Sequence, residues 1–165
     1  MNKIDLPQPA GYDEDFALWS AKQAALLREG RFDQLDIENV AEEIASLGDS
    51  QRDEIESRLG VLLLHLLKWN FQPEKRSNSW RATIVEQRNR IRRRILRSPS
   101  LKTYPGEVLL DEYESARLYA SGETALPLSD FPQNCPYSIE QILDSDFWPG
   151  LPRPQDEPKR FPPSQ

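Results

Sequence analysis

The density of apolar positions along the chain is highest over residues 55–71, which read IESRLGVLLLHLLKWNF. Apolar residues recur there at every third or fourth position, which is the spacing of one face of an α-helix. The stripe consists of Ile55, Leu59, Leu62, Leu66 and Trp69, and the rest of the circumference is mostly covered by Val61, Leu63, Leu64 and Leu67. A helix that is apolar on nearly all sides must be covered on several sides. The pattern therefore predicts a central helix of a helical domain, with Leu62 and Leu66 fully buried.

Two helices are predicted before the central one. The first spans 13–29, and Gly30 suits the position after its C-cap. The second starts at Asp33 or Asp36, either of which can cap it, and is closed by Gly48. The predicted inward-facing residues are Phe16, Trp19, Gln23, Leu26 and Leu27 in the first helix, and Ile37, Val40, Ala41, Ile44 and Leu47 in the second. Because only a few residues separate the second helix from the central one, these two are expected to be antiparallel neighbours.

The central helix is expected to open at a capping box of Ser50 and Asp53 and to stop before Pro73. A fourth helix is predicted to begin at residue 77 or 79 and to end at 97. A fifth is predicted over 105–121, because proline is tolerated only in the first turn of a helix. The predicted inner faces are Trp80, Thr83 or Ile84, Gln87, Ile91 and Ile95 in the fourth helix, and Leu109, Tyr113, Ala116 and Ala120 in the fifth.

Both ends of the chain are rich in proline and offer little to bury. Residues 1–11 are expected to form an extended arm and residues 150–165 a proline-rich disordered tail, on either side of one helical domain at 12–149. Near the end of that domain a second capping-box pattern, SIEQ, opens a short helix at 139–143. No alternation of apolar and polar residues is long enough for a strand. The prediction is an all-α fold: an antiparallel bundle of about five main helices around the central helix, plus the short C-terminal helix.

Composition favours a soluble cytoplasmic protein. The single cysteine, Cys135, allows no intrachain disulfide, which fits a reducing compartment. The N-terminal residues lack the apolar core of a signal peptide. The central apolar run is interrupted by Arg58, His65 and Lys68 and is shorter than a membrane span requires. We therefore expect a cytoplasmic location and no membrane partner.

Charge is unevenly distributed over a chain whose net charge is −6. Residues 68–102 contain eleven basic residues against two acids, a local balance of +9. The extreme is the segment RNRIRRRILR at 88–97, whose candidate nucleic-acid contacts are Arg88, Arg92, Arg93 and Arg94. The favoured interpretation is instead that this arginine face pairs with acidic helices of the same chain or of a second copy, since charge alone argues for solubility and association.

Arg58 and His65 are the candidate catalytic residues. Seven positions separate them, about two helical turns, so both side chains fall on one stripe. The pair resembles the arginine–histidine motif of the helical HEPN ribonucleases, in which histidine transfers a proton and arginine steadies the phosphate. The competing interpretation is a structural histidine at the edge of the core, bonded to a carboxylate or a backbone carbonyl. Glu38 and Glu42 on the second helix are the predicted partners, forming a polar cluster with Arg58 and His65 between the two helices.

The residue inventory argues against several other chemistries. With one histidine, the chain lacks the paired Glu-x-x-His motifs of di-iron bundles and the Cys and His ligands of a structural zinc site. It also lacks a P-loop and a Gly-x-Ser-x-Gly nucleophile elbow. We therefore expect no metal and no cofactor, and an enzyme is not the favoured interpretation.

Four runs of residues together resemble the bacterial domain-of-unknown-function 29 family, which is common in photosynthetic bacteria. They are YDEDFALW, LLREGRFDQLDIENVAEEIASLG, LLLHLLKWNFQPEKRSNSWRATIVEQR and CPYSIEQILDSDFWP. The resemblance covers about residues 12–149 and implies a small all-helical protein without an assigned activity. The favoured function is a non-catalytic module for protein binding or assembly, with a protein partner or self-association. The alternatives are a metal-independent ribonuclease and nucleic-acid binding through the arginine-rich helix.

Overall fold

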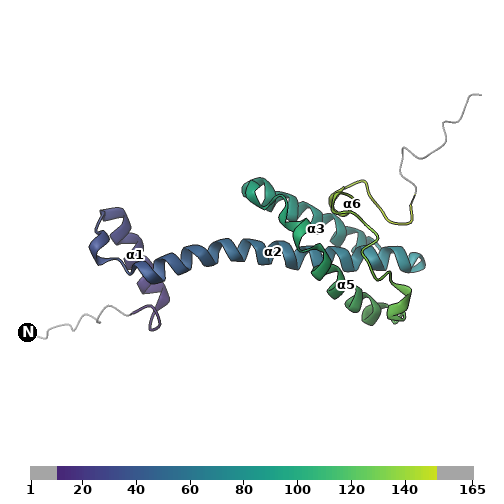
Figure 1. Cartoon of the computed structure of the whole chain (residues 1–165), viewed down its shortest axis with the longest axis horizontal. Coiled ribbons are helices and arrows are strands. Elements are labelled where there is room, and N and C mark those ends of the chain that lie inside the picture. Colours follow the sequence, from purple (N-terminus) through teal and green to yellow (C-terminus); the bar gives the residue numbers. More distant parts are fainter. Residues whose placement is uncertain (1–10, 152–165) are drawn as a thin grey trace, which may run out of the picture. The chain divides into compact units, whose positions relative to one another are not determined.

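A computed structural model describes residues 11–151, and all regular elements in that range are helical (Figure 1). The described residues divide into two compact units, 11–50 and 51–151. The all-α prediction is confirmed, and no strand occurs in the range described. The expected arm at 1–11 and tail at 150–165 lie outside the described residues, apart from their inner ends. No helix between residues 11 and 151 has the length and apolar character needed to cross a membrane.

The unit 11–50 contains α1 (Phe16–Glu29) and the first part of α2 (Ile37–Phe71), joined by a short 3-10 turn. The Asp15 side chain caps α1 by accepting the N–H of Leu18 at 2.9 Å. Gly30 ends the helix in the left-handed conformation, with φ of 70°, as the sequence pattern predicted. Trp19, Gln23 and Leu26 are its buried residues.

Asp36 links the two helices of this unit. Its carboxylate accepts the indole N–H of Trp19 at 3.0 Å and the side-chain amide of Asn39 at 2.8 Å. Its own backbone N–H donates to Gln23 at 2.9 Å. The hydrogen bonds from Asn39 and Trp19 to the carboxylate lower the pKa of Asp36, with that from the Asn39 side chain contributing most. The backbone N–H of Asn39 also donates to the Asp36 carboxylate, at 3.4 Å, so of the two predicted caps it is Asp36 that lies at the start of α2.

The predicted break at Gly48 is wrong, because α2 runs without interruption from Ile37 to Phe71. A glycine inside a helix costs only about 1 kcal/mol relative to alanine, and no proline follows it until Pro73. The capping-box pattern of Ser50 and Asp53 lies inside the helix instead of opening it. The second and central helices of the prediction are one element, so they cannot be antiparallel neighbours.

In the unit 51–151, the second part of α2 packs with α3 (Asn78–Arg97) and α5 (Leu109–Thr124) (Figure 1). The central apolar stripe is buried as predicted, and Leu62 and Leu66 have no exposed surface. The other core residues of these three helices are Leu59, Leu63, Leu67, Trp69, Ile84, Ile91, Tyr113, Ala116 and Ala120. This unit holds most of the hydrophobic core.

Local signals set most of the remaining boundaries. α2 ends before Pro73, and Ser77 caps α3 by accepting the N–H of Trp80 at 3.2 Å. The predicted fifth helix is divided into α4 (Tyr104–Glu107) and α5, with Val108 between them, and α5 continues past Gly122. α6 (Ile139–Leu143) has the predicted capping box of Ser138 and Gln141.

Candidate functional site

Arg58 lies in a network between α2 and α3. Its Nε donates to Glu54 at 2.8 Å and its Nη1 donates to Gln87 at 3.2 Å. Glu54 also accepts a hydrogen bond from Arg94. The two guanidinium groups lower the pKa of Glu54, with the bond from Arg58 as the largest cause. Arg58 is thus already engaged by side chains of its own unit.

His65 bonds to its own helix. Its Nδ1 lies 2.9 Å from the carbonyl oxygen of Val61, so Nδ1–H donates to that oxygen. Burial lowers the pKa of His65, and the positive charge of Lys68 acts in the same direction. The ring is therefore neutral at neutral pH, and its carbonyl partner is of the kind that the structural interpretation expected.

The predicted polar cluster of Arg58, His65 and Glu38 or Glu42 is wrong. Glu38 and Glu42 are exposed residues of the unit 11–50, whereas the hydrogen bonds of Arg58 and His65 are made within the unit 51–151. The cluster depended on a second helix folded back against the central one, and the continuous α2 removes that arrangement. Although Arg58 and His65 share a stripe, no described residue is a hydrogen-bond partner of both.

Arg88 is the most buried arginine of α3, with 2 % of its surface exposed. Its Nε donates to the carbonyl of Ile142 at 2.8 Å, its Nη2 donates to that of Phe147 at 2.7 Å, and its guanidinium lies 5.4 Å from the Trp148 ring. Burial lowers its pKa from 12.5 to about 10, so it stays charged at neutral pH. Arg88 thus connects α3 to α6 and to the segment after α6. Because the side chain is buried, it offers no exposed surface to a phosphate.

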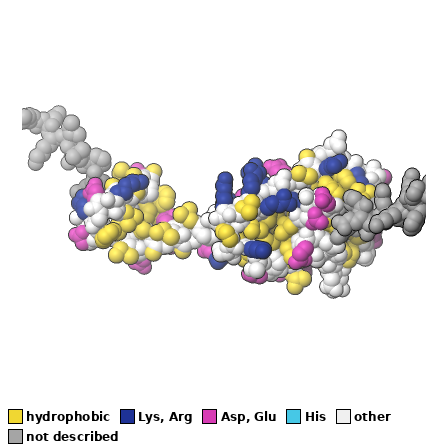
Figure 2. Space-filling view, turned by 90° about the horizontal axis from the view of Figure 1, so that it is seen from above, with side chains coloured by type: hydrophobic (Ala, Val, Ile, Leu, Met, Phe, Trp, Pro, Cys, Tyr) yellow, Lys and Arg dark blue, Asp and Glu magenta, His cyan; other side chains and the backbone are white. Residues whose placement is uncertain are grey.

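The other candidate arginines have different environments. Arg94 pairs with Glu54, which supports the interpretation that part of the arginine face is neutralised within the chain. Arg92 is exposed and donates to the carbonyl of Leu143 at 3.4 Å, and Arg93 is exposed as well. A small cleft of about 160 Å³ is lined by Glu54, Arg90, Arg93, Arg94 and Arg97. Figure 2 shows several Lys and Arg side chains close together on the unit 51–151.

Large apolar side chains are exposed along the first part of α2. Ile37, Ile44 and Leu47 are 66 %, 63 % and 67 % exposed, and Val40 is half-buried. These four residues, here called the α2 apolar stripe, were predicted to face inward. Figure 2 shows hydrophobic side chains gathered on the surface of this unit. The prediction of an apolar face is confirmed, but its burial is wrong, because the helix expected to cover it does not fold back.

α1 adds to the exposed apolar surface of the same unit. Phe16 and Leu27, which were predicted to face inward, are 50 % and 44 % exposed, and Phe32 in the following turn is also exposed. Monomeric proteins rarely leave a large contiguous apolar surface open to water. The sequence does not distinguish the exposed Phe16 and Leu27 from the buried Trp19 and Leu26, because all four fit the same helical period.

The described residues contain no group of three or more His, Cys, Asp or Glu side chains placed to hold a metal ion. Cys135 is half-buried, and burial raises the pKa of its thiol. A raised pKa leaves less thiolate, so the arrangement does not favour a nucleophilic cysteine.

Comparison with known proteins supplies the family. No curated protein and no solved structure matches the chain. The family model described as "Domain of unknown function DUF29" matches residues 12–148. Because that match covers most of the sequence, the chain belongs to the DUF29 family.

Proposed function

We propose that the protein is a non-catalytic protein-binding module whose α2 apolar stripe receives a helix of a partner polypeptide. The observation that carries the proposal is the exposure of Ile37, Ile44 and Leu47 on a unit whose buried residues are few. Exposed apolar surface of this kind marks interaction sites in soluble proteins. The unit 11–50 has a small hydrophobic core, and a helix that covered the stripe would enlarge it.

The spacing of the stripe indicates a helical partner. Ile37, Val40, Ile44 and Leu47 follow each other at intervals of three and four residues, the a and d pattern of a coiled coil. The a positions hold the β-branched residues Ile37 and Ile44, and the second d position holds Leu47, which is the pattern that favours two-stranded packing; the first d position holds Val40. Residues 11–50 carry ten acidic and three basic side chains, so a partner helix with basic flanks would complement them. The basic α3 of a second copy is one helix of that chemistry.

The test compares the wild-type chain with the double variant Ile44→Asp, Leu47→Asp. Both side chains are exposed, so the fold should survive, and circular dichroism checks that it does. Sedimentation velocity over a concentration series measures self-association, and affinity capture followed by mass spectrometry measures other partners. We expect association in one of the two experiments and its loss in the double variant.

Leu110→Asp is the matched control, because Leu110 is a 72 % exposed leucine of α5 in the other unit. It should bind as the wild type does. A wild type that associates with nothing, or an equal loss of association in the control and the double variant, would contradict the proposal.

Nucleic-acid binding is a second candidate, favoured by the cleft on α3. Arg90, Arg93 and Arg97 are exposed and lie at helical spacing, so they can follow a phosphate backbone. Reversing Arg93 and Arg97 to Glu should then abolish binding of single-stranded RNA at physiological salt and flatten its salt dependence. The negative net charge of the chain makes this candidate weaker than the first.

The ribonuclease alternative has less support from the same geometry. Arg58 is held by Glu54 and Gln87, and His65 donates to Val61. A ribonuclease would need both groups directed at one phosphate. Incubation of the purified protein with RNA tests it directly, and cleavage that is lost in His65→Ala would restore this alternative.

A further inference from the structure

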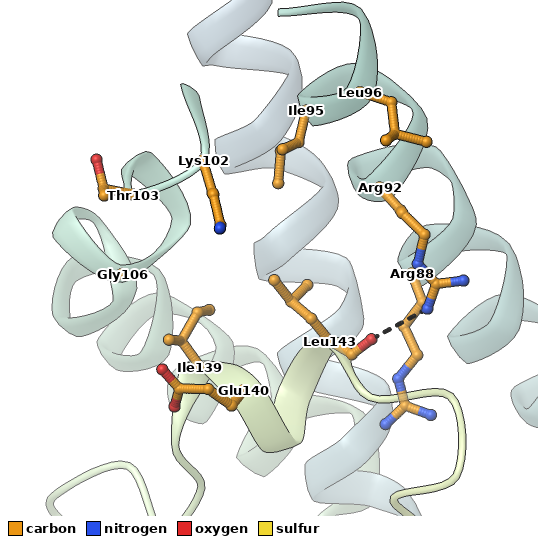
Figure 3. Close-up of a pocket in the computed structure, with 10 residues that line it drawn as sticks. All are labelled: Arg88, Arg92, Ile95, Leu96, Lys102, Thr103, Gly106, Ile139, Glu140 and Leu143. Atoms are coloured by element: carbon orange, nitrogen blue, oxygen red, sulfur yellow. Dashed lines mark hydrogen bonds between the residues drawn. The ribbon is translucent and has the colours of Figure 1, made fainter. Parts of the chain in front are cut away.

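A cavity of about 540 Å³ lies between α3, α4 and α6 in the unit 51–151 (Figure 3). Its apolar lining is made by Ile95 and Leu96 of α3 together with Ile139 and Leu143 of α6. Gly106 of α4 leaves one wall without a side chain, and an added Cβ there would stand 3.9 Å from Ile139. The volume falls within the range of small-molecule sites in proteins.

Positively charged side chains line this cavity on two sides, because Figure 3 shows Lys102 and Arg92 with Ile95 and Leu143 between them. In Figure 3 the ammonium group of Lys102 points into it. No described side chain forms an ion pair or hydrogen bond with that ammonium group. Arg92 lines the cavity as well, and its Nη2 donates a long hydrogen bond of 3.4 Å to the carbonyl of Leu143. Lys102 is therefore the cation available to the head of a bound molecule, and Arg92 adds positive charge on the other side of the cavity.

The other charged residues of the lining are Glu140 and Arg88. Glu140 is the one carboxylate among the lining residues, and it lies in the first turn of α6. Hydrogen bonds from its own backbone N–H and from Ser138 lower its pKa, so it stays ionised. The guanidinium of Arg88 is directed away from the cavity in Figure 3, where its Nε and Nη2 donate to the carbonyls of Ile142 and Phe147 and its buried Nη1 has no partner among the described residues. The local balance favours a ligand with a single negative charge.

We propose that this cavity binds an amphipathic carboxylate, with an aliphatic body against Ile95, Leu96, Ile139 and Leu143 and a carboxylate head at Lys102. Burial of the aliphatic body would supply most of the binding free energy. The ammonium group of Lys102 would fix the orientation of the molecule. A doubly charged phosphate head fits less well, because Glu140 lies on the same lining and would repel it more strongly.

The proposal is independent of the protein-binding function, because the α2 apolar stripe belongs to the other unit. A single molecule can therefore be tested for both properties. Loss of the stripe by Ile44→Asp and Leu47→Asp should leave carboxylate binding unchanged, and loss of carboxylate binding should leave partner binding unchanged.

The test measures binding of dodecanoate to the full chain by isothermal titration calorimetry, below the concentration at which it forms micelles. The wild type should bind one molecule. Lys102→Glu should weaken binding on the order of tenfold, because repulsion of the head replaces attraction. Gly106→Leu should abolish binding by filling the cavity, and its melting temperature shows whether it is folded. Methyl dodecanoate, which has the same body without the charge, should bind the wild type and Lys102→Glu equally.

Lys75→Glu is the matched control, since Lys75 is an exposed lysine of the same unit away from the cavity. It should bind dodecanoate as the wild type does. Absence of binding to the wild type overturns the proposal. So does binding that Lys102→Glu and Gly106→Leu leave unchanged, because the ligand would then lie elsewhere.

Discussion

Leu66 has no exposed surface and lies in the core that α2 forms with α3 and α5. Truncation to alanine removes buried apolar atoms and leaves a cavity that the neighbours fill only in part. Leu66→Ala is therefore expected to lower the free energy of unfolding by ~2–5 kcal/mol. Equilibrium denaturation with urea measures the change. Leu110→Ala, at an exposed leucine, should change it by less than about 0.5 kcal/mol, and an equal effect of both would contradict the burial.

His65 is the one histidine of the chain, so it provides a pH dependence near neutrality that few other side chains share. Burial lowers its pKa below the usual 6.5 and Lys68 lowers it further, whereas the hydrogen bond to the Val61 carbonyl and the charge of Glu123 raise it. As the pH falls through about 6.5, the unfolded chain takes up a proton before the folded chain does. The free energy of unfolding should therefore fall between that pH and the lower pKa of the folded state.

His65→Gln should remove this part of the pH dependence when unfolding is measured by urea at a series of pH values. Glu112 must be controlled, because burial raises the pKa of its carboxyl and contributes with the opposite sign. The measurement is therefore repeated in a Glu112→Gln background. Equal pH profiles for the histidine and glutamine proteins would show that burial does not perturb His65.

The burial of Arg88 could not be predicted from the sequence. Its place in the run RNRIRRRILR indicates an exposed cation, and nothing local distinguishes it from Arg92 four residues later. What buries it is the pair of carbonyls at Ile142 and Phe147, more than fifty residues away. Buried polar groups are normally paired, but the partner can come from any part of the chain. Gln87, which accepts from Arg58, was missed for the same reason, whereas Glu54 and Val61 lie one helical turn before Arg58 and His65.

At the scale of elements, helix boundaries set by steric rules or by side-chain caps were predictable, and boundaries that depend on a weak helix propensity were not. Gly30, Ser77, Ser138 and Pro73 act within a few residues of themselves, and the structure follows each of them. Glycine can adopt helical as well as turn conformations, so the pattern around Gly48 is compatible with a turn or with a continuous helix. The error at this one position changed the predicted neighbours of two helices and with them the predicted site.

Gly48→Ala tests the continuous α2 directly. Gly48 lies inside the helix, with no neighbouring atom in the space that a Cβ would occupy. Alanine should therefore raise the free energy of unfolding by about 1 kcal/mol through its higher helix propensity. Gly30→Ala should do the reverse, because Gly30 has φ of 70°. A destabilising effect of Gly48→Ala in urea denaturation would instead support the turn that the sequence pattern predicted.

At the scale of the molecule, the two units differ in how much core each contains. The unit 11–50 buries few of its large apolar residues, and a unit of about forty residues is near the lower limit for independent stability. The unit 51–151 contains the connected core of α2, α3 and α5. Local opening costs little free energy where few apolar contacts are broken. The unit with the exposed stripe is therefore expected to open without unfolding the other.

Hydrogen exchange measured by mass spectrometry on the full chain tests this difference. In dilute protein, amides of α1 should exchange roughly a hundredfold faster than those of α2 between Leu59 and Trp69, because opening of the smaller core costs less. If the α2 apolar stripe binds a partner helix, protection of α1 and of residues 37–47 should rise with saturation by that partner. Protection of α3 outside the contact should stay constant, since its core is already complete. Equal protection of α1 and the central stripe in dilute protein would show that the unit 11–50 is stable without a partner, and the need for a covering helix would then disappear.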